Sequence, residues 1–426
     1  MIETKFKESE LGPIPYDWEE SKICDTFLLR SNNTLSRDKL NYYYTDGIRN
    51  IHYGDILTIF GPFVTPKCKL PFINSESISN FDHLYNGDII VADTAEDETV
   101  GKATEIVNFA GEKVVAGLHT IVLRPIASFA PIFLGYLFNS NYYHKALIPH
   151  MQGTKVTSIS KKAILSTSIC FPPSISEQER IAEALSDVDA LIKELDALIE
   201  KKRMVLKATM QDLLTARRRL PGFSEPWKTI KLANEGISFS GLTGKSANDF
   251  GKGKGLFVTF VNVIYNTIIN PNLFQKVDIR PGENQNNVII GDILFNTSSE
   301  TPEEVGMCSM VNIDLPNLYL NSFCFGYRIK SNNLDPLFLA YLLRSAIGRD
   351  IMTELAQGST RFNLPKKKFL KTNISIPTSL TEQQAIAEIL SDMDSEIAEL
   401  EKKKEKYTSI RQGMMQQLLT GKIRLI

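Results

Sequence analysis

The sequence is poor in the residues that hold together small stapled or metal-bound folds. The 426-residue chain has five cysteines, five histidines and two tryptophans. The cysteines are scattered, no two form a Cys-x-x-Cys pair, and none lies near a histidine at metal-ligand spacing. These absences argue against a disulfide framework and against a zinc site. We therefore expect a chain that folds through ordinary apolar cores in a reducing compartment.

Long apolar runs and an excess of one charge are also missing. No uninterrupted apolar stretch approaches the ~20 residues that span a bilayer, and residues 1–10 carry charges where a signal peptide has an apolar core. We expect a cytoplasmic protein with no membrane partner. The 48 Lys and Arg residues nearly cancel the 49 Asp and Glu residues. Because proteins that neutralise many phosphates are usually basic, composition alone does not indicate nucleic acid.

The chain does contain an internal duplication. Residues 172–220 align without a gap on residues 377–425, and nearly half of the positions are identical. Each copy follows a more variable part of domain size. Such a unit is too long for a solenoid repeat, so the duplication predicts two related domains, each followed by a shared segment.

The shared segment predicts a long amphipathic helix. Ser176 or Thr381 can cap its start, with Glu179 or Gln384 three residues on, as in a capping box. Apolar residues then recur at alternating four- and three-residue steps, the spacing of a coiled-coil seam. Because the two seams match in phase, we expect the helices to pair antiparallel; two separate helices, each packed on its own domain, are the alternative. The seam residues are Ile181, Leu185, Val188, Ile192, Leu195 and Ile199 in the first copy and Ile386, Leu390, Met393, Ile397 and Leu400 in the second.

The variable parts mix strands and helices. Runs rich in Val and Ile at 88–125 and 287–295 predict strands, whereas 131–147 and 336–352 predict helices. The expected fold class is therefore α+β: two α/β domains separated by two long antiparallel coiled-coil helices, with internal pseudo-two-fold symmetry. The expected boundaries are a first domain at 1–173, a central helical spacer at 174–219, a second domain at 220–378 and a C-terminal helical spacer at 379–426.

The motifs that could indicate an enzyme are incomplete. Residues 171–174 (FPPS) resemble the catalytic motif of adenine methyltransferases, which needs Asp or Asn before the prolines and an aromatic residue after them. Residues 244–246 (GKS) resemble the end of a P-loop, but Phe239 stands where the first glycine is needed. The glycines of 250–255 (FGKGKG) suggest a mobile loop. We expect no catalytic site, no metal and no cofactor in this chain.

Two polar loops occupy matched positions, at 152–158 (QGTKVTS) and 357–363 (QGSTRFN), and each precedes a lysine pair. Arg and Lys can bridge guanine O6 and N7, Asn and Gln can bridge adenine N6 and N7, and lysines suit phosphates. An ordinary solvated loop is the alternative. Acidic stretches at 93–99 and 296–304 also match, and we expect them to form a turn after a strand. The candidate DNA-binding residues are Gln152, Thr154, Lys155, Ser158, Lys161, Lys162, Gln357, Ser359, Thr360, Arg361, Asn363, Lys366 and Lys367.

These features together resemble the specificity subunits of type I restriction–modification systems. Pro-x-x-x-x-Glu-Gln-x-x-Ile-Ala begins each helical segment, and Leu-Leu-Thr ends each. Residues 213–227 look like the family's central junction, residues 11–18 like its first-domain entry, and residues 88–106 resemble a target-recognition segment. The resemblance covers nearly the whole chain, and the twice-used helix motif is specific.

The resemblance implies a non-catalytic subunit that reads double-stranded DNA. Each domain would be a target-recognition domain for one half of a bipartite, asymmetric site. The helices would act as a ruler and dock two methyltransferase subunits, which bind S-adenosylmethionine and through which restriction and translocase subunits join. The alternative is a two-module coiled-coil scaffold that does not contact DNA. The residues expected at the coiled coil and its partners are Glu177, Gln178, Ile181, Leu185, Val188, Ile192, Leu195, Glu382, Gln383, Ile386, Leu390, Met393, Ile397 and Leu400.

The ruler can be tested by lengthening it. One heptad inserted into both helices adds ~10 Å along a helix, about three base pairs of DNA. We expect the unread gap of the DNA site to lengthen accordingly while both half-sites stay the same. Mapping methylated sites before and after the insertion measures this, and an unchanged gap would contradict the ruler.

Overall fold

A computed structural model describes residues 5–43, 47–73 and 82–426, and the chain divides into two units. Unit 1 comprises residues 1–196 and 403–426, and unit 2 comprises residues 197–402. Two helices of 39 residues each, α6 (Ile175–Leu213) and α12 (Leu380–Leu418), contribute one half to each unit. Every unit thus consists of one mixed domain and two half-helices. The boundaries expected at 173, 219 and 378 stay a prediction.

The domain of unit 1 is built on two small sheets. The larger sheet has the strand order β4-β12-β8-β10-β6, with only the β10–β6 pair parallel, and the smaller has the order β11-β5-β7. All four residues of β8 are buried, which fits a strand covered on both faces. The strands are β4 (Phe27–Arg30), β5 (Ile48–Ile51), β6 (Phe63–Val64), β7 (Phe72–Ile73), β8 (Ile89–Ala92), β10 (Ala103–Ile106), β11 (Val114–Ala116) and β12 (Thr120–Pro125).

The domain of unit 2 repeats most of this topology, with four strands in its larger sheet where unit 1 has five. Its larger sheet has the order β16-β23-β19-β21, and its smaller sheet has the order β18-β17-β22. In the smaller sheets, β17 is parallel to β22 and antiparallel to β18, as β5 is to β11 and β7. The duplication therefore extends to the strand pairing. The strands are β16 (Gly236–Ser240), β17 (Phe250–Val258), β18 (Gln275–Val277), β19 (Ile293–Asn296), β21 (Cys308–Met310), β22 (Leu318–Leu320) and β23 (Cys324–Ile329).

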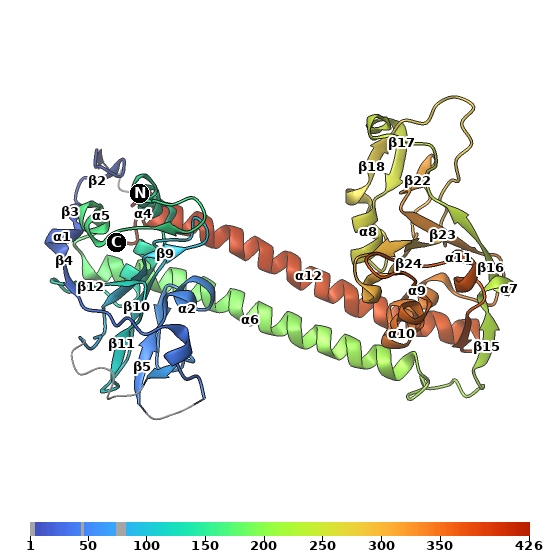
Figure 1. Ribbon diagram of the computed structural model, residues 1–426, viewed down its shortest axis with the longest axis horizontal. Helices are drawn as coiled ribbons and strands as arrows, with labels where there is room; N and C mark the ends of the chain where they lie inside the picture. Colours follow the sequence, from blue (N-terminus) through green and yellow to red (C-terminus); the bar gives the residue numbers. More distant parts are fainter. Residues whose placement is uncertain (1–4, 44–46, 74–81) are drawn as a thin grey trace. The chain divides into compact units, whose positions relative to one another are not determined.

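Short helices cover the sheets where the sequence predicts them (Figure 1). The predicted helix at 131–147 is two helices, α3 (Phe133–Phe138) and α4 (Asn141–Leu147), and its counterpart is α9 (Pro336–Arg344) followed by α10 (Ala346–Leu355). Each pair is split at a serine because Ser140 and Ser345 accept the first N–H groups of the second helix, from Tyr143 and Gly348. Two further matched helices, α2 (Tyr53–Thr58) and α8 (Phe260–Tyr265), follow β5 and β17.

In unit 1 the two half-helices run antiparallel against the domain. Ile181 and Leu185 of α6 belong to the same buried core as Leu418, the last residue of α12, and Leu419, which follows it. Farther along, Asp189 pairs with Arg411, and Asp196 pairs with Lys404 at 2.5 Å. Residues later in α6 thus contact residues earlier in α12, as expected for an antiparallel pair.

Unit 2 contains the complementary halves in the same arrangement. Leu213, the last residue of α6, and Leu214, which follows it, share a buried core with Ile386 and Leu390 of α12. Lys202 pairs with Glu396 at 2.6 Å. The predicted antiparallel pairing is therefore confirmed within each unit, and each half-helix also packs on its own domain. Of the seam residues, Ile181, Leu185, Leu195, Ile199, Ile386, Leu390 and Ile397 are buried, and Val188, Ile192, Met393 and Leu400 are half-buried.

The helix starts differ from the expected capping boxes. Ser174 and Ser379 accept the N–H groups of Glu177 and Glu382, so each cap lies two residues before the predicted Ser176 or Thr381. This start places a glutamate, Glu177 or Glu382, at the third helical position, where an arginine binds it.

The glutamate and glutamine of the shared motif anchor each helix to its own domain. Gln178 accepts from the backbone N–H of Ala130 and donates to the carbonyl of Pro172, at 2.9 and 2.8 Å. Glu177 accepts two hydrogen bonds from Arg424, and both members of the motif are buried. Unit 2 repeats these contacts: Gln383 bonds Asp335 and Pro377, and Arg219 donates to both oxygens of Glu382. The polar atoms of Glu177, Gln178, Glu382 and Gln383 are thus used inside each unit, and their expected place at the coiled coil and its partners stays a prediction.

One buried carboxyl makes the stability of unit 1 sensitive to pH. Glu105 of β10 accepts the backbone N–H groups of Ile132 and Gly135 at 2.8 Å each, which caps the start of α3. Burial outweighs these two bonds and raises the pKa of Glu105 to about 7. A folded pKa above the unfolded value means that the stability contributed by Glu105 is complete below pH 4.5 and is lost as the pH rises through 7.

We therefore expect the free energy of unfolding of unit 1 to fall between pH 5 and pH 8 by about 2–3 kcal/mol more in the native protein than in the Glu105→Gln variant. The reason is that each pKa unit is worth 1.36 kcal/mol. Urea unfolding of the full chain in a Trp227→Phe background, followed by the fluorescence of the buried Trp18, measures unit 1 alone. The difference between the two proteins removes the titration of every other group. Parallel pH dependences would show that Glu105 is already ionised in the folded state.

Candidate nucleic-acid interface

The two polar loops form matched hairpins. The backbones of Gln152 and Ser158 exchange two hydrogen bonds, of 3.0 and 2.8 Å, and those of Gln357 and Asn363 exchange two of 2.9 and 2.8 Å. Each loop is therefore closed at the same two positions, although five of its seven residues differ between the copies.

A glycine sets the shape of each hairpin. Gly153 and Gly358 have φ values of 114° and 138°, in the region that other residues rarely adopt. A Cβ on Gly153 would lie 1.9 Å from the carbonyl oxygen of Val156, and one on Gly358 would lie 2.1 Å from that of Arg361. Only glycine fits, so the backbone is constant while the side chains that follow it vary.

Each hairpin is attached to the strand end that carries an acidic stretch. Its closing strand, β13 (Thr157–Ser158) or β24 (Phe362–Asn363), pairs with β9 (Thr94–Ala95) or β20 (Ser298–Ser299). The carboxylates of these stretches bond locally: Asp97 accepts from Thr99, and Glu304 accepts from Ser299. The acidic stretches form turns after a strand, as expected, and these two carboxylates are satisfied within the turns.

The hairpins present their polar side chains to solvent. Arg361 has no side-chain partner among the described residues; its carbonyl accepts a 3.4 Å bond from Asn363. An exposed, unpaired guanidinium in a rigid hairpin is free to make a bidentate contact. The exposed candidates are Gln152, Thr154, Lys155, Ser158, Gln357, Ser359, Thr360, Arg361 and Asn363, together with Lys161, Lys162 and Lys367 of the lysine pairs.

One predicted phosphate ligand has a different role. Lys366 is half-buried, bonds the hydroxyl of Ser240 at 3.3 Å and lies 5.7 Å from the ring centroid of Phe325. Burial lowers its pKa. Its counterpart Lys161 is exposed and lies 3.3 Å from the side-chain oxygen of Asn32. Lys366 thus joins its hairpin to the sheet and is not a free phosphate contact.

Unit 2 has two exposed cations that the sequence did not single out. The segment 250–255, expected to be a mobile loop, begins β17, and both Phe250 and Gly255 lie opposite Val277. The intervening GKGK therefore bulges out and exposes Lys252 and Lys254, neither of which has an ion-pair partner among the described residues. The repeated glycines were a sign of this bulge. The bulge thus brings two positive charges to one place on the surface of a nearly neutral chain.

Lys245, in the segment that resembles a P-loop, forms an ion pair within the unit. The ammonium group of Lys245 is buried, bonds Glu283 at 2.6 Å and also donates to the carbonyl oxygen of Asp278. A P-loop lysine must instead reach a phosphate. The GKS segment is structural.

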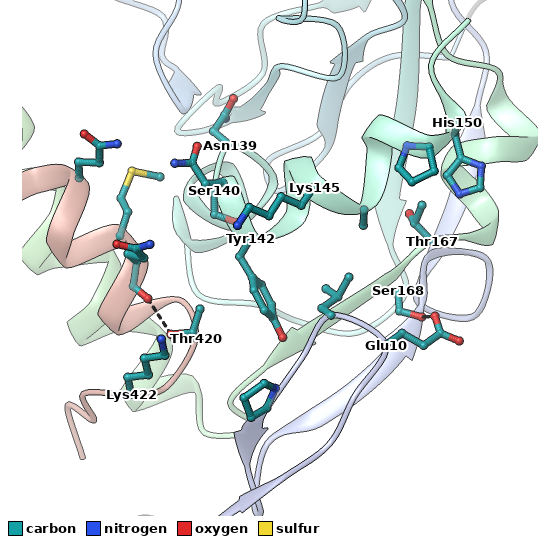
Figure 2. Close-up of a pocket in the computed structure, with 18 of the residues that line it drawn as sticks. Glu10, Asn139, Ser140, Tyr142, Lys145, His150, Thr167, Ser168, Thr420 and Lys422 are labelled. Atoms are coloured by element: carbon teal, nitrogen blue, oxygen red, sulfur yellow. Dashed lines mark hydrogen bonds between the residues drawn. The ribbon is translucent and has the colours of Figure 1, made fainter.

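Unit 1 also contains a pocket of about 740 Å³ between α4, the N-terminal segment and the second half of α12 (Figure 2). Lys145, His150 and Lys422 line it. Glu10, the one carboxylate among its lining residues, accepts a 2.7 Å bond from Ser168. This bond holds the N-terminal segment against the rest of unit 1.

Neither a metal site nor a membrane-spanning helix is found among the described residues. Their His, Cys, Asp and Glu side chains form no group of three that could hold a metal ion. Among the helices formed by these residues, none is long and apolar enough to cross a membrane.

Comparison with known proteins identifies relatives along almost the whole chain. Over 99% of this chain and 97% of the relative, the sequence is 28% identical to the putative type I restriction enzyme MjaX specificity subunit of Methanocaldococcus jannaschii. It is 21% identical to the type I restriction enzyme EcoKI specificity subunit of Escherichia coli, over 88% of this chain and 82% of that one.

Solved structures share the fold. The type I restriction–modification S subunit from M. genitalium superposes with a TM-score of 0.57 at 17% identity, covering 94% of this chain and 96% of that one. A chain from a solved type I restriction–modification system gives a TM-score of 0.54, also at 17% identity, over 96% and 99% of the two chains.

A protein-family model matches most of the chain. Residues 15–201 and 243–407, most of both units, match the type I restriction modification DNA specificity domain. The chain therefore belongs to the family of type I restriction–modification specificity subunits.

Proposed function

We propose that each unit reads one half of a bipartite, asymmetric DNA site through its glycine-constrained hairpin. The observation that carries the proposal is the pair of hairpins at 152–158 and 357–363, which share a backbone closure and differ in exposed side chains. Reading two different half-sites requires a constant frame with variable hydrogen-bonding groups, since base identity is read from donors and acceptors in the groove.

The side chains suit different parts of DNA. The planar guanidinium of Arg361 can bridge guanine O6 and N7, and the amides of Gln152 and Gln357 can bridge adenine. The exposed Lys162 and Lys367, and the bulge cations Lys252 and Lys254, suit phosphates, which position the protein without reading sequence. With a net charge of −1, the chain leaves part of the phosphate attraction to its partners.

The partners are two methyltransferase subunits, and matched apolar residues on the helices support this stoichiometry. Val205 of α6 in unit 2 and Ile410 of α12 in unit 1 occupy equivalent positions in the duplicated segment. They lie outside the seam and remain 45% and 39% exposed. Met204, beside Val205, is also exposed. Exposed apolar groups at matched positions of the two helices suit a protein partner.

The chain itself supplies specificity and no chemistry in this proposal. The methyltransferase subunits hold S-adenosylmethionine, and restriction and translocase subunits join through them, in the cytoplasm. The incomplete methyltransferase motif at 171–174 supports this division, because Phe171 and Ser174 cannot replace the residues that the motif needs.

Base reading is tested by Arg361→Ala and Lys155→Ala. We expect Arg361→Ala to relax one position in the half-site read by unit 2, at a cost of ~1–3 kcal/mol, and Lys155→Ala to affect only the other half-site. Competition binding by the complex with its methyltransferase subunits, with one base varied at a time, measures both. Lys367→Ala is the control, because a lost phosphate contact weakens all sequences alike and flattens the salt dependence.

Uniform weakening by Arg361→Ala would make Arg361 a phosphate contact. An unchanged profile for both hairpin variants would show that the hairpins are solvated loops. A native complex without salt-sensitive, sequence-selective binding would favour the scaffold alternative.

Partner docking is tested by Val205→Glu and Ile410→Glu. We expect each variant to bind one methyltransferase subunit and the double variant to bind none, because each charge lies in one of two equivalent surfaces. The mass of the assembled complex, measured by native mass spectrometry, counts the subunits. Lys207→Ala, an exposed polar position on α6, is the control that should retain two. Retention of both subunits by the double variant would place the partner surface elsewhere.

A further inference from the structure

A short turn occupies the same place in each unit, immediately before the strand β12 or β23. In unit 1 the N–H of Gly117 donates to the carbonyl of Ile51, at the end of β5, at 2.8 Å. In unit 2 the N–H of Asn321 donates to the carbonyl of Val258, at the end of β17, at 3.1 Å. The turns at 117–119 and 321–323 therefore occupy the same place in each unit, and their last residues are His119 and Phe323.

Backbone hydrogen bonds place both turns beside the hairpins. The N–H of Asp93 donates to the carbonyl of His119 at 3.1 Å, and the N–H of Ile159, the residue after the hairpin, donates to the carbonyl of Asp93 at 2.8 Å. In unit 2, Thr297 bonds Phe323 at 3.0 Å, and Leu364 bonds Thr297 at 2.8 Å. In each unit, a single intervening residue links the end of the turn to the base of the hairpin.

The His119 side chain is oriented and accessible. Its Nδ1 lies 3.3 Å from a carboxylate oxygen of Asp93 and 3.4 Å from the hydroxyl of Thr94, and the ring meets that of Tyr53 edge-on at 5.3 Å. The imidazole is 46% exposed, and its Nε2 has no hydrogen-bond partner within the described residues. His119 also has a φ of 57°, which is uncommon for a residue other than glycine and which Phe323 does not share.

Phe323 presents a different chemistry from the equivalent position. Phe323 is 62% exposed, and its N–H donates to the side-chain oxygen of Asn321 at 2.8 Å, which fixes the turn. A large apolar side chain beside a polar hairpin has no core to join. Phe is one of the side chains that contact the C5 methyl group of thymine in the major groove, whereas an imidazole nitrogen can bond a base edge.

We infer that these turns carry a second base-reading residue in each unit, His119 in unit 1 and Phe323 in unit 2. The inference rests on the proposed function and extends it from the hairpins to a separate segment. His119 bonds a base edge through Nε2, with its ring held by Asp93 and Tyr53. Phe323 selects a T·A pair by apolar contact.

The test uses His119→Ala and Phe323→Ala in the full chain, assembled with its methyltransferase subunits. Competition binding with duplexes varied one base pair at a time gives a preference at every position. We expect His119→Ala to reduce the preference at one position of the unit 1 half-site about tenfold, the effect of ~1.4 kcal/mol. Phe323→Ala should reduce the preference for T·A at one position of the other half-site by a similar factor. His119→Gly, which suits the backbone of the turn, should give the same profile as His119→Ala.

The controls are two exposed apolar residues away from the turns, one at the other end of β12 and one before β19, which pairs with β23. Ile126 follows β12 and Ile290 precedes β19, and they are 59% and 58% exposed. Ile126→Ala and Ile290→Ala should leave every preference unchanged. Uniform weakening of all duplexes, or an unchanged profile beside a selective native complex, would overturn this inference and leave the hairpin proposal intact. A native complex without selectivity would overturn both.

Discussion

The structure depends on a buried ion pair that ties the segment after one long helix to the start of the other. Arg424 follows α12 and binds Glu177 at the start of α6, whereas Arg219 follows α6 and binds Glu382 at the start of α12. Both glutamates are buried. Removing one member of such a pair leaves a charge without compensation, which is far more costly than the loss of a surface pair. Because the pair joins opposite ends of two helices, it also requires the antiparallel register that the apolar seam follows.

The duplicated units keep this framework and change the groups around it. Tyr136 donates to Asp189, and Tyr341 donates to Asp394, in equivalent places. Asp189 also pairs with Arg411, whereas in unit 2 the equivalent of Arg411 is Leu206, and burial raises the pKa of Asp394. Both carboxylates thus accept from a tyrosine, but only Asp189 also forms a salt bridge, whereas Arg344 acts on Asp394 without one. The shared framework therefore tolerates different charged groups around equivalent carboxylates.

Much of the fold was predictable because its signals are periodic and duplicated. The seam spacing predicted the long helices and their antiparallel pairing, and the matched offset located both polar loops, although not their hairpin closure. The roles of Glu177 and Gln178 were not predictable, because they depend on Arg424 and Ala130, which the sequence does not place beside them.

The same limit applies to the candidate site. Nothing local distinguishes Lys366 from Lys367, yet only the first reaches Ser240 and the ring of Phe325. The glycines of 250–255 were compatible with a loop or with a bulged strand, and the pairing with Val277 decides for the strand. The importance of His119 and Phe323 also depends on backbone bonds to residues distant in sequence.

The two units differ in how their residues are distributed along the chain. Unit 2 is continuous, from residue 197 to residue 402, whereas unit 1 needs Leu418 and Leu419 to complete the core that surrounds Ile181 and Leu185. During synthesis the first domain therefore emerges long before the half-helix that closes it, and unit 2 has all of its residues while unit 1 is still incomplete. Domains usually fold in the order in which they are made. Here the domain that is translated first is the one that is finished last.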